Sequence, residues 1–128
     1  MLRQLTGFTF AAALGMMAMT GSAFAEGDAA KGEKVFKKCK ACHTMEAGKN
    51  KVGPSLAGII GATPGAVEGY KYSKAMIAFG EGGAVWDDAT LDAYLKKPKE
   101  VVPKTKMSFA GLKKDADRAN VIAFMKGE

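Results

Sequence analysis

The sequence predicts an all-α protein with one small domain, and three observations support this class. Apolar residues recur at helical spacing in four stretches separated by glycine and proline. No stretch alternates apolar and polar residues over enough positions to indicate a strand. The 128 residues suffice for one domain at most. We therefore expect about four to five helices joined by loops rich in glycine and proline.

The first 25 residues have the composition of a secretory signal peptide. Arg3 gives a positive start, an apolar run of 13 residues spans 7–19, and Ala23 and Ala25 are small residues placed as before a cleavage site. The run is shorter than the roughly 20 residues that span a bilayer, although an uncleaved anchor is the alternative. We expect cleavage after Ala25, export to the periplasm, and a single domain over 26–128.

The first expected helix begins after Asp28, a residue type that caps helix N-termini. Its apolar stripe has the spacing i, i+3, i+4, i+7 and consists of Gly32, Val35, Phe36 and Cys39. The helix is expected to end near segment 39–43. Glycines and prolines then interrupt any period over residues 44–72. A loop of that length in a compact domain indicates a functional role.

Three further helices are expected in the second half of the chain. Ser73 and Asp87 are the expected caps of the first two, which end near Phe79 and before Pro98. A run of glycines forms a turn between them. After Pro98 we expect a turn and an extended segment, and then the last helix over about 115–126.

The chain is basic, with 19 lysines and arginines against 13 acidic residues and a formal net charge of +6. Nucleic-acid binding is one interpretation of such a charge. The acids are interleaved, however, and an exported protein meets little nucleic acid. A basic surface that attracts acidic partner proteins is the better interpretation, and we expect no nucleic-acid partner.

Cys39-Lys40-Ala41-Cys42-His43 is the C-x-x-C-H pattern of covalent haem attachment. Residues i and i+3 face the same way on a turn, so both thiols can add to the vinyl groups of one porphyrin. The next imidazole then lies under the iron. A thioredoxin-like thiol pair is the alternative, but it requires a βαβ context and no histidine. We expect one haem c, bound through Cys39 and Cys42 with His43 as an iron ligand.

A second axial ligand is expected to be a methionine, because the chain has one histidine and both cysteines are used. The candidates after the signal peptide are Met45, Met76, Met107 and Met125. Met45 is two residues from His43 and cannot easily reach the opposite haem face. Met76 and Met125 lie in expected helices, where core packing is the ordinary role. Spacing favours Met107, in a non-helical stretch, without excluding the others.

The chain resembles class I cytochromes c, most closely the bacterial cytochrome c2 group, over nearly all of residues 27–127. The resemblance rests on Gly27-Asp28, Cys39-Lys40-Ala41-Cys42-His43-Thr44, Lys51-Val52-Gly53-Pro54, Gly69-Tyr70-Lys71-Tyr72-Ser73, Leu91-Asp92-Ala93-Tyr94-Leu95, Lys97-Pro98-Lys99 and the run from Pro103 to Gly111. It implies the class I cytochrome c fold wrapped around one covalent haem, with Met107 as sixth ligand. It also implies that the first and last helices cross at Gly32, Phe36, Val121 and Phe124.

The resemblance implies roles for further residues around the haem. Pro54 matches a proline whose carbonyl accepts the proton of the ligating histidine. Tyr72 and Trp86 match side chains that hydrogen-bond a buried haem propionate. Tyr94 and Thr105 match hydroxyls near the methionine sulfur and the other propionate. Without the resemblance, Trp86 and Tyr94 would be ordinary core residues.

Two positions depart from the family pattern. Ala62 stands where many members have an arginine directed at the propionates, so their charge is less compensated and a somewhat lower reduction potential is expected. Met76 stands where many members have an asparagine near an internal water. The polar network beside the methionine ligand is therefore expected to differ here.

The resemblance implies a monomeric, soluble electron carrier in the periplasm and not an enzyme. Relatives carry electrons from a cytochrome bc1-type complex to a photosynthetic reaction centre or a terminal oxidase, and the sequence does not distinguish these acceptors. A haem enzyme or gas-binding protein is the alternative, and it requires a dissociable Met107. A structural or signalling module with haem as core filler is a third hypothesis.

Lysines are expected to surround the exposed haem edge and to dock membrane redox complexes. This lysine face consists of Lys38, Lys40, Lys49, Lys51, Lys97, Lys99, Lys104, Lys106, Lys113 and Lys114. Acids gather elsewhere, at Glu81, Asp87, Asp88, Asp92, Asp115 and Asp117. The alternative is that these lysines only solvate the surface.

Overall fold

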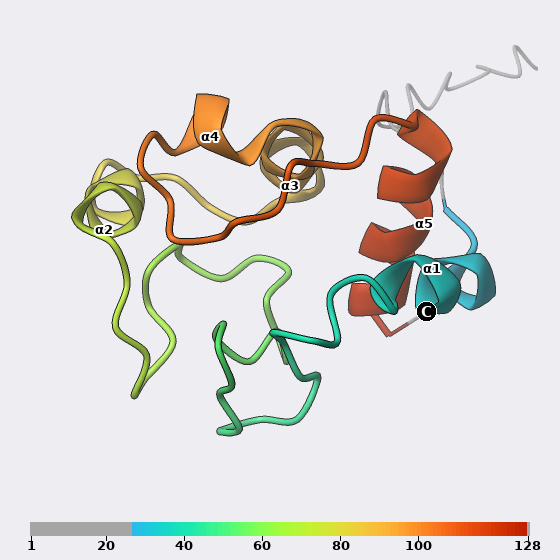
Figure 1. Cartoon of the computed structure of the whole chain (residues 1–128), viewed down its shortest axis with the longest axis horizontal. Helices are drawn as coiled ribbons and strands as arrows, with labels where there is room; N and C mark the ends of the chain where they lie inside the picture. Colours follow the sequence, from blue (N-terminus) through green and yellow to red (C-terminus); the bar gives the residue numbers. More distant parts are fainter. Residues whose placement is uncertain (1–26, 128) are drawn as a thin grey trace, which may run out of the picture.

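The computed structural model describes residues 27–127, so the expected signal peptide lies outside the described residues. The described part contains five helices and no strand, which confirms the all-α class (Figure 1). The helices are α1 (Ala29–Phe36), α2 (Lys74–Glu81), α3 (Asp88–Lys96), α4 (Pro98–Val101) and α5 (Asp115–Met125). None of these helices is long and apolar enough to span a bilayer.

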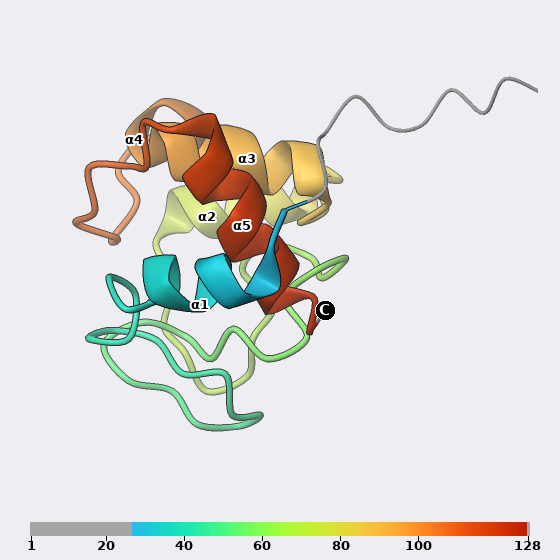
Figure 2. The same ribbon diagram turned by 90° about the vertical axis from the view of Figure 1, so that its right-hand side faces the viewer.

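Helices α1 and α5 cross in close contact, as Figure 2 shows. The crossing depends on Gly32, because a Cβ at this position would lie 1.9 Å from the carbonyl oxygen of Asn120. The rings of Phe36 and Phe124 pack beside it with centroids 5.1 Å apart. Val121 is 1% exposed in the same interface. The predicted crossing of the first and last helices is therefore confirmed.

Three helices begin at the capping residues that the sequence predicts. The Asp28 side chain accepts two N–H groups of the first turn of α1, at 2.9 and 3.1 Å. Ser73 accepts the N–H of Met76 at 3.1 Å, and Asp87 accepts that of Thr90 at 2.8 Å. The side-chain and backbone hydrogen bonds from Thr90 also lower the pKa of Asp87.

The helix ends differ from the sequence-based expectations in three places. Helix α1 ends at Phe36, before the expected segment 39–43, which forms hydrogen-bonded turns. Helix α2 continues to Glu81, so Gly80 lies inside a helix and not in a turn. The missing side chain permits a close approach, because a Cβ at Gly80 would lie 2.0 Å from the carbonyl oxygen of Pro64. A short helix, α4, replaces the turn expected after α3, with a proline at its first position. Proline is favourable there because its N–H would have no helical partner.

The long loop between α1 and α2 contains no helix and is held by side chains that bond backbone atoms. Asn50 Nδ2 donates to the carbonyl of Glu68 at 3.0 Å, and its Oδ1 accepts the N–H of Ser55 at 2.9 Å. Ser55 Oγ donates to the carbonyl of Glu46 at 2.6 Å. In Figure 1 this loop faces α2, α3 and α4, while α1 and α5 lie to one side. The predicted long loop therefore forms one side of the molecule, facing α2, α3 and α4.

Candidate haem site

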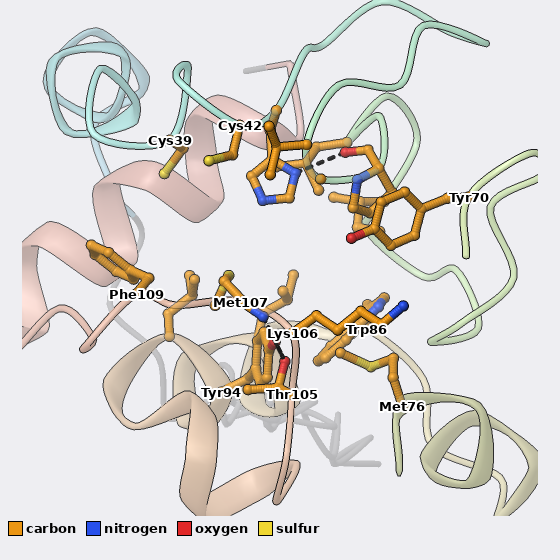
Figure 3. A pocket seen from close by; sticks show the side chains of 18 of the residues that line it. Cys39, Cys42, Tyr70, Met76, Trp86, Tyr94, Thr105, Lys106, Met107 and Phe109 are labelled. Carbon is orange, nitrogen blue, oxygen red and sulfur yellow. Dashed lines mark hydrogen bonds between the residues drawn. The ribbon is translucent and has the colours of Figure 1, made fainter. Parts of the chain in front are cut away.

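The Cys39–His43 segment forms a helical turn directly after α1. The N–H of Cys39 donates to the carbonyl of Phe36 at 2.8 Å, and the N–H of His43 donates to the carbonyl of Cys39 at 2.9 Å. Both thiols are free and lie on the same side of the turn (Figure 3). Burial and the neighbouring Cys42 thiol raise the pKa of Cys39, so this thiol keeps its proton at neutral pH before any attachment.

The imidazole of His43 is oriented by the loop that follows it. Nδ1 donates to the carbonyl oxygen of Pro54 at 2.8 Å, which leaves Nε2 available as a metal ligand. Gly53 permits the close approach, because a Cβ there would lie 2.4 Å from Cε1 of the ring. The N–H of Gly53 donates to the carbonyl of Cys42 at 2.7 Å. The contact between His43 and Pro54 that the resemblance implies is present.

A cavity of about 290 Å³ separates this segment from the opposite wall. Cys39 and Cys42 lie on one side of it, and Met107, Thr105 and Tyr94 lie on the other (Figure 3). Much of the remaining lining is apolar and includes Leu56, Ile59, Leu91, Leu95, Val121 and Met125. The cavity therefore brings together groups that are more than 50 residues apart in the sequence.

Met107 belongs to a segment without helix between α4 and α5, the Met107 loop (residues 102–114). Its N–H donates to Thr105 Oγ1 at 3.3 Å, and the Thr105 and Tyr94 hydroxyls are hydrogen-bonded at 2.9 Å. The N–H of Thr105 donates to the carbonyl of Val102 at 3.1 Å and closes a turn. Lys104 in this turn has φ 63°. These contacts brace the backbone that presents the thioether.

The other methionines have different surroundings. Met76 and Met125 are both buried and also line the cavity, so each combines core packing with a position beside the site. Figure 3 places Met76 next to Trp86, away from the two cysteines. Met45 packs against the core and is not among the lining residues.

Aromatic side chains close one edge of the cavity. Trp86 is 5% exposed, and its ring lies 5.0 Å from Tyr94 and 5.7 Å from Phe79. The Tyr72 hydroxyl accepts the N–H of Val67 at 3.2 Å, which leaves its own proton available as a donor. Burial raises the pKa of Tyr72 and of Tyr94, so both phenols are protonated at neutral pH.

Tyr70 also lines the cavity, although the sequence analysis assigned it no role. Its ring lies edge-on to Tyr72 at 4.8 Å, and its hydroxyl points toward the cavity in Figure 3. This hydroxyl has no hydrogen-bond partner among the described residues. In the sequence, Tyr70 stands out only as part of the Gly69–Ser73 segment, one of those on which the family resemblance rests.

These residues fit a covalently bound haem. Two thiols three residues apart, an oriented imidazole and a facing thioether supply the donor atoms that such a group uses. The apolar lining suits a porphyrin face, and the phenols at one edge suit its carboxylates.

The family model described as Cytochrome c matches residues 29–127. The chain belongs to the cytochrome c family. Cytochrome c2 of Rhodomicrobium vannielii is 50% identical over 107 residues, covering 83% of each chain. Cytochrome c-554 of Methylosinus trichosporium is 44% identical over 125 residues, 97% of this chain and 92% of the relative. The solved structure of cytochrome cH from Methylobacterium extorquens superposes with a TM-score of 0.72 at 44% identity, covering 80% of this chain and 100% of that one.

Family membership confirms several of the expectations drawn from the sequence. The chain is a class I cytochrome c of the bacterial c2 type with the all-α cytochrome fold. It binds one haem c covalently, through Cys39 and Cys42. It is an electron-transfer protein and not an enzyme.

All ten residues of the lysine face are exposed, and Lys38 and Lys106 line the cavity itself. The expected separation from acidic residues is incomplete. Lys49 forms an ion pair with Glu46, and Lys97 forms one with Glu100, each at 3.3 Å. Glu46 and Glu100 are not among the acids that were expected to lie away from the face, and each is three residues from the lysine that it pairs with. Both pairs are i, i+3 and exposed, so each contributes little stability.

Proposed function

We propose that His43 and Met107 are the two axial ligands of the haem iron. The observation that carries this proposal is their position in one cavity, with Met107 on the wall opposite the cysteine segment. The Pro54 carbonyl holds the His43 ring so that Nε2 is free to bind the metal. The braced turn around Thr105 holds Met107 toward the cavity, and a thioether ligand raises the reduction potential.

The bound haem supplies a one-electron change between Fe(III) and Fe(II). If the His43 imidazole and the Met107 thioether both held the iron, no position would be left for a substrate, which favours electron transfer over gas binding. We assign Tyr72 and Trp86 as donors to one propionate, and Tyr94 and Thr105 as hydroxyls beside the thioether and the other propionate. The Tyr94–Thr105 hydrogen bond supports the second assignment.

We infer that the chain is exported, with residues 1–25 removed as a signal peptide, and works as a monomer in the periplasm. Its donor is a cytochrome bc1-type complex, and its acceptor is a photosynthetic reaction centre or a terminal oxidase. The similarity to proteins named cytochrome c2 supports this assignment. The lysine face would dock the acidic surfaces of these partners, since long-range attraction raises association rates.

Carbon monoxide tests the proposed coordination against the gas-binding alternative. The reduced holoprotein at neutral pH should show no spectral change under carbon monoxide, because Met107 occupies the sixth position. Rapid carbon monoxide binding would favour the haem enzyme or gas-binding protein with a dissociable Met107. Re-reduction of flash-oxidised reaction centres, in cells with and without this gene, would identify a photosynthetic acceptor.

A further inference from the structure

Arg118 is a buried cation that the haem-site assignments do not use. Its side chain is 3% exposed and lies in α5. Nε donates to Asp92 of α3 at 2.8 Å, and Nη2 donates to Asp115 in the first turn of α5. Nη1 donates to the carbonyl oxygens of Leu112 and Lys113, at 2.8 and 3.1 Å. One guanidinium therefore joins two helices and the end of the Met107 loop.

The backbone of this loop end is held from both directions. The N–H of Leu112 donates to the carbonyl of Leu95 at the end of α3, at 2.7 Å, while its own carbonyl is bound by Arg118. The adjacent Gly111 has φ 119°, and a Cβ there would lie 2.2 Å from the carbonyl oxygen of Lys96. Leu112 itself is 4% exposed. The segment that follows Met107 thus lies directly on α3 and is fastened to α5.

This connection joins the two walls of the cavity. Helix α5 packs extensively on α1, which continues into the cysteine segment. The Met107 loop and α3 form the opposite wall. Arg118 extends from α5 to that wall. Removing any one partner of such a buried, charge-assisted network is strongly destabilising.

We propose that Arg118 is the positioning residue of the sixth ligand: it locks the Met107 loop to α5 and so limits dissociation of Met107 from the iron. The proposal rests on the proposed ligation by Met107. Without Arg118, the carbonyl oxygens of Leu112 and Lys113 lose their hydrogen bonds, and the loop end loses its connection to α3 through Asp92. The loop would then open without unfolding of the remaining domain.

A second ion pair provides a matched control. Lys126 Nζ lies 2.5 Å from Asp88 Oδ2, so this pair also joins α3 to the C-terminal end of α5, the end opposite the Met107 loop. Asp92→Asn and Asp88→Asn each weaken one α3–α5 ion pair by an isosteric change. The Asp92 side chain is 25% exposed, which makes its replacement tolerable to the fold. Asp115→Asn is the second test variant if Asp92→Asn gives no holoprotein.

The experiment measures imidazole binding to the oxidised holoproteins, because imidazole enters only when Met107 has left. Asp92→Asn should raise the imidazole association rate about tenfold, the effect of weakening a charged hydrogen bond. Asp88→Asn should leave the rate within about twofold of the native protein. The free energy of unfolding is measured in parallel and should fall more in Asp92→Asn, whose partner Arg118 is buried, than in Asp88→Asn.

Equal imidazole rates in the two variants would overturn the proposed role of Arg118, whatever their global stability. Failure of the underlying ligand assignment is recognised separately. If Met107→Ala keeps the sulfur-to-iron absorption band, Met107 is not the ligand. If that variant loses the band but the two aspartate variants bind imidazole at equal rates, Met107 is the ligand and only the proposed role of Arg118 is wrong.

Discussion

At the scale of single residues, the Met107 loop contains one backbone conformation that its side chain disfavours. The turn over 102–105 has proline at its second position and a positive φ at its third, the pattern of a type II turn. Glycine is the usual residue at the third position, yet this chain has Lys104. A left-handed conformation costs an L-residue about 1–2 kcal/mol.

Lys104→Gly should therefore raise the free energy of unfolding by roughly 1 kcal/mol, after part of the gain is offset by the flexibility of glycine in the unfolded chain. Urea unfolding of the holoprotein measures this. Lys104→Ala removes the same charge but keeps a Cβ, so it should give no comparable gain. Equal stabilisation by both variants would mean that charge, and not backbone strain, is relieved.

Local chemistry explains which site residues the sequence predicted. The cysteines and His43 are adjacent in the chain, so one short pattern carries their chemistry. Arg118 and Tyr70 gave no such signal, because their partners and the cavity they face come from segments far apart in the sequence. Spacing favoured Met107 among four candidate methionines, and the family resemblance singled it out.

At the scale of helices, beginnings were easier to predict than ends. Caps such as Ser73 and Asp87 act on N–H groups within three residues, so the sequence contains the whole interaction. The end of α2 depends on contact between Gly80 and Pro64, and α4 forms between α3 and the Met107 loop. These are tertiary effects, which no short window of sequence contains.

The crossing of α1 and α5 is the helix contact that depends most on one residue. Gly32→Ala should lower the free energy of unfolding by about 3 kcal/mol or more, because its Cβ would overlap the backbone of Asn120 and force the helices apart. Thermal and urea unfolding of the holoprotein measure the loss. Gly82→Ala is the control, since a Cβ there meets no atom closer than 3.4 Å. Similar losses in both variants would contradict the steric explanation.

At the scale of the whole molecule, several lysines of the lysine face lie at or next to the cavity. Lys38 and Lys106 line the cavity, and Lys99 lies beside Phe109 in a groove next to it. Two of the ten lysines are offset by nearby glutamates. The lysine face is therefore less uniformly positive than the sequence indicated, and we expect Lys99 to contribute more to docking than Lys97.

Charge reversal tests this expectation. Lys99→Glu should slow the second-order reaction with a cytochrome bc1-type complex several-fold at low salt, because attraction steers the encounter. Lys31→Glu is the control, on the exposed face of α1 eight residues before Cys39, about 12 Å of helical rise. The difference should vanish near 1 M salt, where the screening length is about 3 Å. Equal slowing by both variants would contradict docking through the lysine face.

Coordination of the iron by both His43 and the Met107 thioether, as we propose, would leave the haem only electron transfer. The weak near-infrared sulfur-to-iron band of the oxidised holoprotein tests it most directly. Met107→Ala should abolish the band and lower the reduction potential, whereas Met76→Ala and Met125→Ala should keep the band, although both side chains line the same cavity. Persistence of the band in Met107→Ala, or its loss in Met76→Ala, would contradict the account.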